Sequence, residues 1–189
     1  MKNFLIPLML LFLIPGSMLG QRTETIFDNS GAWISGIWLG PTYNYTQFGE
    51  DFAFVRGAVY GFELADIILV GWTTTRFKDW VSLEDTPVNF KMKYTNFFFS
   101  LTPASRKAIH PILSFQTGPG RLLIEGGDDD RVFIMQPSIG FEANVFEWCR
   151  LALEGGYRFV NEIEASTGLS EEDVSSLYGQ ISLKFGFSW

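Results

Sequence analysis

The sequence has few basic residues and one cysteine. Lys and Arg together number 14 against 21 Asp and Glu, which gives a formal net charge of -7 over 189 residues. Binding to nucleic acid needs a basic surface, so this balance argues against nucleic acid as a partner. Cys149 cannot form an intramolecular disulfide, and no histidine stands near it in the sequence to activate it. We therefore interpret Cys149 as a buried or lipid-facing side chain rather than a catalytic thiol.

Long apolar runs are also missing after the first residues. Phe4–Ile14 is apolar, follows Lys2 and precedes Pro15-Gly16-Ser17-Met18-Leu19-Gly20. This layout predicts a secretory signal peptide over residues 1–20, with the mature chain beginning at Gln21. No later run is long enough to predict a membrane-spanning helix, and the absence of a cysteine after Gly20 argues against a lipoprotein anchor.

The residues that are abundant favour β-structure. The chain has 19 Gly, 19 Phe, 6 Trp and 6 Tyr, and apolar and polar residues alternate along many segments, which is typical of strands. The last segment is the clearest: its odd positions are mostly apolar, whereas its even positions are mostly polar. The odd positions are Leu177, Gly179, Ile181, Leu183, Phe185, Phe187 and Trp189. A final strand with one apolar face and a terminal aromatic residue is common in outer-membrane barrels.

Eight such segments follow one another without an interdomain linker. Three connections are short and three are long, in alternation, and this predicts an eight-stranded antiparallel up-and-down transmembrane β-barrel over residues 21–189, with the short turns in the periplasm. The loop Phe48–Asp51 is short where a long one is expected. Consecutive Phe97, Phe98 and Phe99 predict a bulge or a wet outer end in the fourth strand. The predicted strands are Trp33–Gln47, Phe52–Glu63, Ile67–Phe77, Val88–Leu101, Ala108–Leu123, Val132–Val145, Arg150–Val160 and Ser176–Trp189.

The last of the long loops, Asn161–Ser175, contains one local helix signal. Ser170 stands three residues before Asp173, which resembles a capping box, so we expect one helical turn there.

The second half of the chain resembles a known group of proteins. The stretches that carry the resemblance are Gln136-Pro137, Glu142-Ala143-Asn144-Val145, Leu153 to Val160, Gly168-Leu169-Ser170 and Leu183-Lys184-Phe185-Gly186, together with His110-Pro111 after a short basic turn. They are similar to the small, mostly uncharacterised outer-membrane β-barrel proteins of diderm (Gram-negative) bacteria. The resemblance implies the barrel fold and a location in the cell outer membrane, and it implies no particular activity.

Charged residues fall on the predicted inner faces of the last three strands. They are Glu142, Arg150, Glu154, Arg158 and Lys184. They could form a path for protons, ions or a ligand, or they could simply fill the barrel. An eight-stranded barrel has room only for its own side chains, and buried charges generally pair with one another. We therefore favour a filled polar lumen.

Two other patterns suggest chemistry only weakly. His110 could act as a base for Ser114 in a membrane-embedded lipid-modifying enzyme, but four residues along a strand separate them by about 13 Å. Gly126-Gly127-Asp128-Asp129-Asp130 could hold Ca²⁺, but three adjacent acids cannot all face one ion, and a solvated acidic loop is the simpler interpretation. We expect no catalytic residue, no cofactor and no metal site.

One competing fold is suggested near the start of the mature chain. Gly31-Ala32-Trp33 matches the Gly-x-Trp of lipocalins, and a lipocalin-like carrier would turn its apolar face inward around a ligand. The main prediction is a barrel without an open pore, with a structural or surface-interaction role. Its expected partners are outer-membrane lipid and the barrel-assembly machinery, which would engage the C-terminal strand. The secreted or periplasmic carrier and the lipid-modifying enzyme are the alternatives.

Overall fold

The computed structural model describes residues 34–48, 51–83, 86–163 and 168–188. The predicted signal peptide over residues 1–20, the Gly31-Ala32-Trp33 match and the terminal Trp189 lie outside the described residues.

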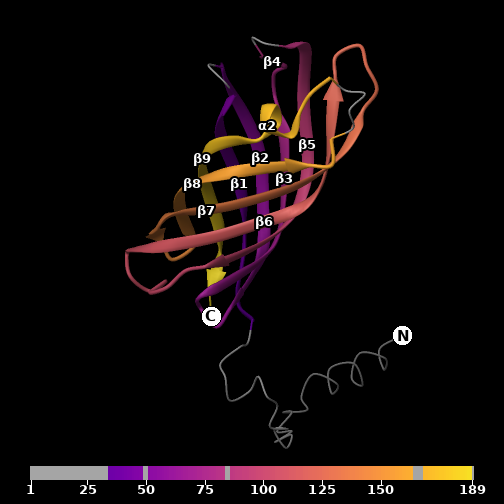
Figure 1. Cartoon of the computed structure of the whole chain (residues 1–189). Helices are drawn as coiled ribbons and strands as arrows, with labels where there is room; N and C mark the ends of the chain where they lie inside the picture. Colours follow the sequence, from indigo (N-terminus) through magenta and orange to yellow (C-terminus); the bar gives the residue numbers. More distant parts are fainter. Residues whose placement is uncertain (1–33, 49–50, 84–85, 164–167, 189) are drawn as a thin grey trace, which may run out of the picture. The chain divides into compact units, whose positions relative to one another are not determined.

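Eight long antiparallel strands form a closed barrel (Figure 1). Each strand pairs with its neighbours in the chain, and the ring closes because the first strand also pairs with the last. This confirms the predicted fold. The strands are β1 (Ile34–Phe48), β2 (Asp51–Leu64), β3 (Ile68–Phe77), β5 (Thr86–Leu101), β6 (Ile109–Ile124), β7 (Asp130–Phe146), β8 (Cys149–Asn161) and β9 (Ser176–Ser188).

A ninth, short strand lies outside this ring. β4 (Val81–Leu83) pairs with β5 alone, whereas β5 also pairs with β3 to continue the barrel. The sequence did not predict β4, since three residues are too few to show an alternation.

In β9 the structure shows which of the two alternating faces points into the barrel. Tyr178, Gln180, Ser182 and Lys184 are buried inside the barrel, whereas Leu177, Ile181, Phe185 and Phe187 are exposed on its outer surface. Large apolar side chains are likewise exposed on the outer face of all eight barrel strands. A lipocalin-like carrier needs the opposite arrangement, so this alternative is wrong.

The two ends of the barrel differ in their connections. The connections β2–β3, β5–β6 and β7–β8 form what we call the short-turn end, and the opposite end is the long-loop end. In the β2–β3 turn, Ala65 and Asp66 both have left-handed backbones, with φ of 52° and 63°. The amide of Ile67 donates to the carbonyl of Leu64 at 3.3 Å. Two left-handed central residues give the tight turn whose twist matches that of paired strands.

The loop between β8 and β9 contains one turn of helix, as predicted. α2 (Glu171–Val174) starts after Ser170, whose side chain accepts from the amide of Asp173 while the Asp173 carboxylate accepts from the amide of Ser170. This is the expected capping box. Within the described ranges, no helix is long and apolar enough to cross a membrane.

The three consecutive phenylalanines of β5 do not form a bulge. β5 keeps one register against β3 and against β6 through Phe97–Phe99, and the register shift lies near Thr86, opposite β4. Phe98 points inward and packs with Trp38, Val59 and Leu69. Of the two explanations that the sequence offered, the bulge is wrong, and the wet outer end, where Lys91 and Lys93 are half-exposed, agrees with the structure.

Candidate functional site

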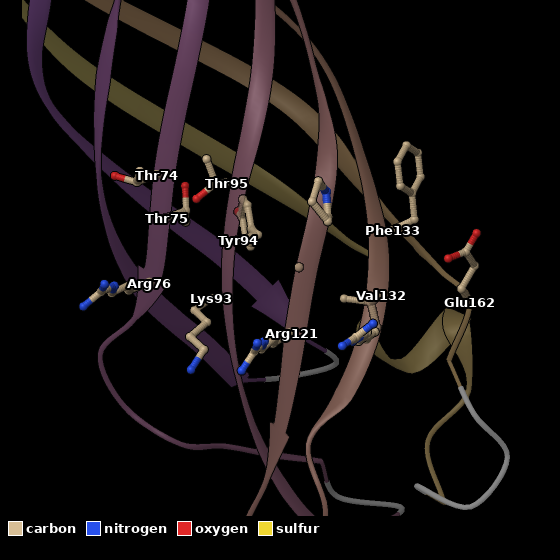
Figure 2. A pocket seen from close by; sticks show the side chains of 13 residues that line it. Thr74, Thr75, Arg76, Lys93, Tyr94, Thr95, Arg121, Val132, Phe133 and Glu162 are labelled. Carbon is tan, nitrogen blue, oxygen red and sulfur yellow. The ribbon is translucent and has the colours of Figure 1, made fainter.

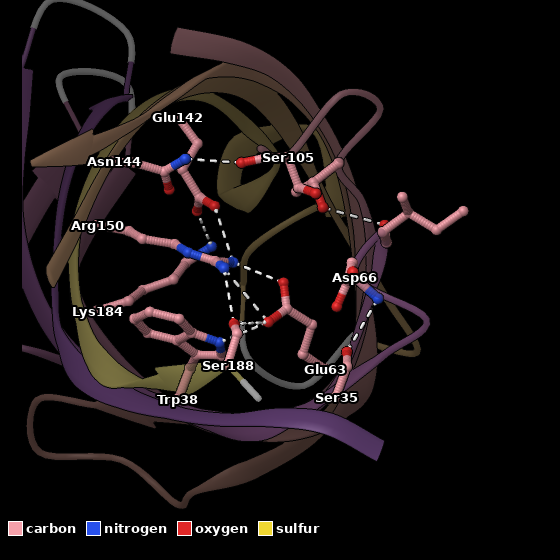
Figure 3. Close-up of polar contacts among 12 residues, drawn as sticks. Ser35, Trp38, Glu63, Asp66, Ser105, Glu142, Asn144, Arg150, Lys184 and Ser188 are labelled. Carbon is pink, nitrogen blue, oxygen red and sulfur yellow. Dashed lines mark hydrogen bonds and ion pairs between the residues drawn. The ribbon is translucent and has the colours of Figure 1, made fainter. Parts of the chain in front are cut away.

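A group of charged side chains fills the lumen near the short-turn end (Figure 3). Arg150 Nη1 lies 2.7 Å from Glu63 Oε1, and Lys184 Nζ lies 2.6 Å from Glu142 Oε2. Arg150 Nη1 also lies 3.6 Å from Glu142 Oε1, which joins the two pairs. Two carboxylates therefore balance two cations. We call these four residues, which come from β2, β7, β8 and β9, the lumen charge cluster.

Neutral side chains complete the coordination of Glu63. Trp38 Nε1 donates to Glu63 Oε2 at 3.0 Å, and the Ser188 hydroxyl donates to the same oxygen. Arg150 Nη2 donates to it as well at 3.3 Å, and the guanidinium lies 3.9 Å from the centre of the Trp38 ring. Burying an ion pair is favourable only when further hydrogen bonds satisfy its polar atoms, and Glu63 meets this condition.

His110 belongs to the same end of the lumen. Its Nε2 lies 3.3 Å from Glu142 Oε1, and its Nδ1 lies 3.1 Å from the carbonyl oxygen of Lys107. Ser114, the nucleophile that an enzyme would require, instead shares a 2.8 Å hydrogen bond with Ser100. The structure thus gives His110 and Ser114 separate partners.

Glu154 and Arg158 lie farther toward the long-loop end and have neutral partners. Glu154 accepts from Ser138 Oγ at 2.9 Å and from Gln180 Nε2 at 3.4 Å. Arg158 is completely buried and donates to Thr46 and Ser176, with aromatic rings around its guanidinium. Within the described residues, no ion pair joins either one to an opposite charge. The five predicted inward charges are all inside the barrel, but only Glu142, Arg150 and Lys184 are paired as expected.

The lumen changes character at its long-loop end, where buried apolar side chains pack together. Residues of seven barrel strands contribute, as do β4 and the β8–β9 loop. The prediction of a polar lumen therefore describes its middle and its short-turn end. We call this cluster the apolar plug; it comprises Phe48, Ala53, Val55, Phe77, Val81, Phe90, Met92, Tyr94, Leu122, Val132, Ile134, Val160, Leu169 and Val174.

The predicted acidic loop is mostly exposed. Asp128 and Asp129 face outward, whereas Asp130 is buried and its Oδ1 accepts from the amide of Arg131 at 2.7 Å. No group of three His, Cys, Asp or Glu side chains suited to a metal occurs in the part of the chain that the structure describes. Cys149 is buried, which is one of the two placements expected for it.

Glu63 and Trp38 are the members of the lumen charge cluster and its shell that sequence reasoning missed. Both faces of β2 are apolar: Val55 and Val59 point inward, while Phe54 and Tyr60 point outward. The side on which Glu63 stands could therefore not be read from alternation. The sequence held one signal for a second carboxylate. Arg150 and Lys184 were both expected in the lumen near Glu142, and a buried cluster tends toward charge balance.

The outer surface between the two ends is a belt of apolar side chains. Exposed residues on it include Leu39, Tyr60, Trp72, Phe97, Leu113, Ile139, Phe141 and Leu153. Aromatic pairs stack on this surface, with ring centres 5.9 Å apart for Tyr43 and Phe54 and 5.0 Å apart for Tyr45 and Phe52. An exposed apolar surface of this extent on a closed antiparallel barrel is the lipid-facing surface of an outer-membrane protein. The protein is therefore located in the outer membrane, in contact with lipid.

Comparisons with known proteins support the architecture. No protein-family model matches the sequence, and no curated protein matches it either. Among solved structures, Neisserial surface protein A aligns with a TM-score of 0.58 and 13% identity, over 84% of this chain and 99% of that one.

Two barrels of Pseudomonas aeruginosa are also similar. The N-terminal β-barrel domain of OprF aligns with a TM-score of 0.55 and 10% identity, over 81% of this chain and 98% of that one. The outer membrane protein OprG aligns with a TM-score of 0.54 and 11% identity, over 85% of this chain and 99% of that one. The chain therefore has the fold of the small eight-stranded outer-membrane β-barrels.

Proposed function

We propose that this protein is a closed, non-conducting barrel with a structural or surface-interaction role in the outer membrane. The proposal rests on one observation: two different clusters fill the lumen, one at each end of the barrel. The lumen charge cluster occupies the short-turn end, and the apolar plug occupies the long-loop end. An ion crossing the barrel would have to break buried ion pairs and then pass through an apolar layer, and both steps are costly.

The β8–β9 loop supports this role because it closes the long-loop end. Leu169 and Val174 belong to the apolar plug, and the capping box at Ser170 fixes the turn between them. The loop presents Glu171, Glu172 and Asp173 outward. An acidic, anchored loop is suited to contact with a partner outside the cell rather than to gating.

A catalytic role has little support. The one histidine is held by Glu142 and by the carbonyl of Lys107, and Ser114 is bonded to Ser100. A nucleophilic mechanism needs a serine within hydrogen-bond reach of its base. We therefore propose that the protein is not an enzyme and uses no cofactor or metal.

Two parts of the biogenesis are also proposed. Residues 1–20 act as a signal peptide, with the mature barrel domain over 21–189. β9 then serves as the recognition strand for the barrel-assembly machinery, because its outer face bears Leu177, Ile181, Phe185 and Phe187 and strands of this type end such barrels.

Planar-bilayer recording tests the proposed function. The purified full chain, folded into bilayers, should give no stable conductance step at moderate voltage. The double variant Phe90→Ala/Met92→Ala empties part of the plug, because both side chains are buried in it, and it should also stay closed, because the lumen charge cluster still fills the short-turn end. Reproducible porin-sized steps from the wild-type protein would contradict the closed barrel.

A further inference from the structure

Five basic residues lie in one line on the outer surface of the barrel. Arg56 of β2 is opposite Arg76 of β3, Arg76 is opposite Lys93 of β5, Lys93 is opposite Arg121 of β6, and Arg121 is opposite Arg131 of β7. Each of these side chains is exposed or half-exposed. We call these five residues the basic row. It contains five of the 14 Lys and Arg residues of a chain whose net charge is -7.

The basic row is electrostatically unfavourable by itself. Like charges directly opposite each other on neighbouring strands are destabilising, and here four such pairs follow one another. Among the described residues, no ion pair joins any member of the row to an acidic side chain. The row therefore has a surplus of positive charge that an anion from outside the protein would relieve.

A hollow accompanies the row on β3, β5, β6 and β7. It measures about 600 Å³ and is lined by Arg76, Lys93, Arg121 and Arg131, with Glu162 as the acidic residue in its lining. Figure 2 shows Arg76, Lys93 and Arg121 side by side on neighbouring strands, with the threonines of the adjacent row beside them. Arginine presents a fork of donors that fits phosphate oxygens, and lysine adds a compact charge.

The row crosses the outer boundary of the apolar band at an angle, because it runs across tilted strands. Arg76 is eight residues from Ile68, the first residue of β3 at the short-turn end, which is roughly 26 Å along the strand and about 20 Å along the normal of a tilted barrel. The apolar band of such barrels is about 25 Å tall. The aromatic pair Trp72 and Phe97 lies on the membrane side of Arg76 and Lys93, with the pair Thr74 and Thr95 between them. By the same count Arg121 is twelve residues from Ile109 and Arg131 is fifteen from Phe146, so the row rises from the outer part of the apolar band into the head-group region of the outer leaflet.

A second hollow lies on the membrane side of the row and is apolar. It measures about 610 Å³ on the outer surface of β5 to β8 and is lined by Phe99, Leu113, Phe115, Ile139 and Gly155, among others. Gly155 leaves open space there, since a side chain at this position would meet no atom within 4 Å. The lining residues Phe99 and Phe115 are six residues from Lys93 and Arg121, about 20 Å along the strands, so the far end of a long acyl chain would reach the hollow from a head group held at the row.

We propose that the basic row binds the phosphate groups of an anionic, phosphate-bearing lipid of the outer leaflet, whose acyl chains lie against the apolar hollow on β5 to β8. Charge complementarity selects this occupant, and the apolar hollow below the row favours a lipid over free phosphate. The proposal goes beyond the closed-barrel role, because a non-conducting barrel needs no particular lipid.

The test measures lipid binding by the folded full-length chain in phosphatidylcholine nanodiscs. The probe is a disaccharide lipid that carries two phosphates, compared with the same lipid after removal of its phosphates and with inorganic phosphate as competitor. Native mass spectrometry counts the lipid that stays bound. The wild-type protein should retain the phosphorylated lipid selectively, and inorganic phosphate at equal concentration should not displace it.

A variant with two cations removed from the centre of the row locates the site. Lys93→Gln/Arg121→Gln should weaken binding about 25-fold, at about fivefold for each cation near a membrane surface. The matched control, Arg106→Gln/Lys107→Gln, removes two exposed basic residues at the short-turn end and should bind like the wild type.

Three results would overturn the proposal. They are equal retention of the two lipids by the wild type, complete displacement by inorganic phosphate, and an equal loss of binding in both double variants. The comparison of lipids uses the wild-type protein alone, so it decides the matter even if the row variant does not fold. None of these results bears on the conductance test, so the two proposals fail separately.

Discussion

Removing the charge of Glu63 perturbs the lumen most sharply. Glu63→Gln keeps the size of the side chain but leaves two cations, Arg150 and Lys184, against the single carboxylate of Glu142. The amide keeps one oxygen, so it can no longer accept from Arg150 Nη1 and Nη2 at two separate oxygens, as Glu63 does.

The expected cost follows from the burial of this pair. Breaking a buried ion pair by removing one partner costs about 3–5 kcal/mol of folding free energy. Arg150 keeps its 3.6 Å contact with Glu142, so we expect the lower value, about 3 kcal/mol. Replacing both partners, in Glu63→Gln/Arg150→Gln, removes the uncompensated charge and should recover much of the loss.

Urea unfolding in phospholipid vesicles, followed by tryptophan fluorescence, measures this free energy. Glu147→Gln is the matched control, because Glu147 is an exposed acid at the same end of the barrel. The reasoning would be refuted if Glu63→Gln and Glu147→Gln differed by less than about 0.5 kcal/mol, the usual range of surface changes. It would also be refuted if the double variant were less stable than Glu63→Gln.

Three further predictions concern the outer surface and the loop. Leu183→Arg places a charge on the lipid-facing side of β9 and should cost about 2–4 kcal/mol in the same urea assay, whereas Leu183→Phe should cost little. Val174→Asp buries a carboxylate in the apolar plug and should release the β8–β9 loop, seen as faster cleavage after Glu171 and Glu172 by a glutamate-specific protease. Ser170→Ala removes the cap of α2, at about 1 kcal/mol, and should raise the same cleavage by less. Cleavage at the wild-type rate in Val174→Asp would contradict the docking of the loop.

The strands could be predicted from the sequence because most of them alternate. β7, β8 and β9 have one apolar and one polar face over most of their length, so both their ends and their inward charges were readable. β4 was not predicted, since Val81–Leu83 is too short and pairs only with β5. Of the two explanations expected for Phe97–Phe99, the bulge was wrong, because Phe98 packs inside the barrel on apolar neighbours from other strands.

A site residue could be predicted only on a strand whose apolar and polar faces are clearly distinguished. Glu142, Arg150 and Lys184 were placed in the lumen, but Glu63 was not, because both faces of β2 are apolar. The basic row was out of reach for a different reason. Its residues come from five strands between positions 56 and 131, and only the register of the barrel aligns them. The apolar plug likewise depends on tertiary contacts between strands and the loop around α2.

The central claim is that the outer surface meets lipid while the lumen is filled, and accessibility along β9 tests it most directly. Single cysteines at Leu177, Ile181 and Phe185 on the outer side, and at Gln180 and Ser182 on the inner side, are introduced into a Cys149→Ser background. The proteins are folded into lipid vesicles and treated with a charged, water-soluble thiol reagent and with a lipid-soluble one. We predict that the outer cysteines react with the lipid-soluble reagent alone and that the inner cysteines react with neither. Reaction of the outer cysteines with the charged reagent would contradict the membrane-spanning barrel. Reaction of the inner cysteines with the charged reagent would contradict the filled lumen.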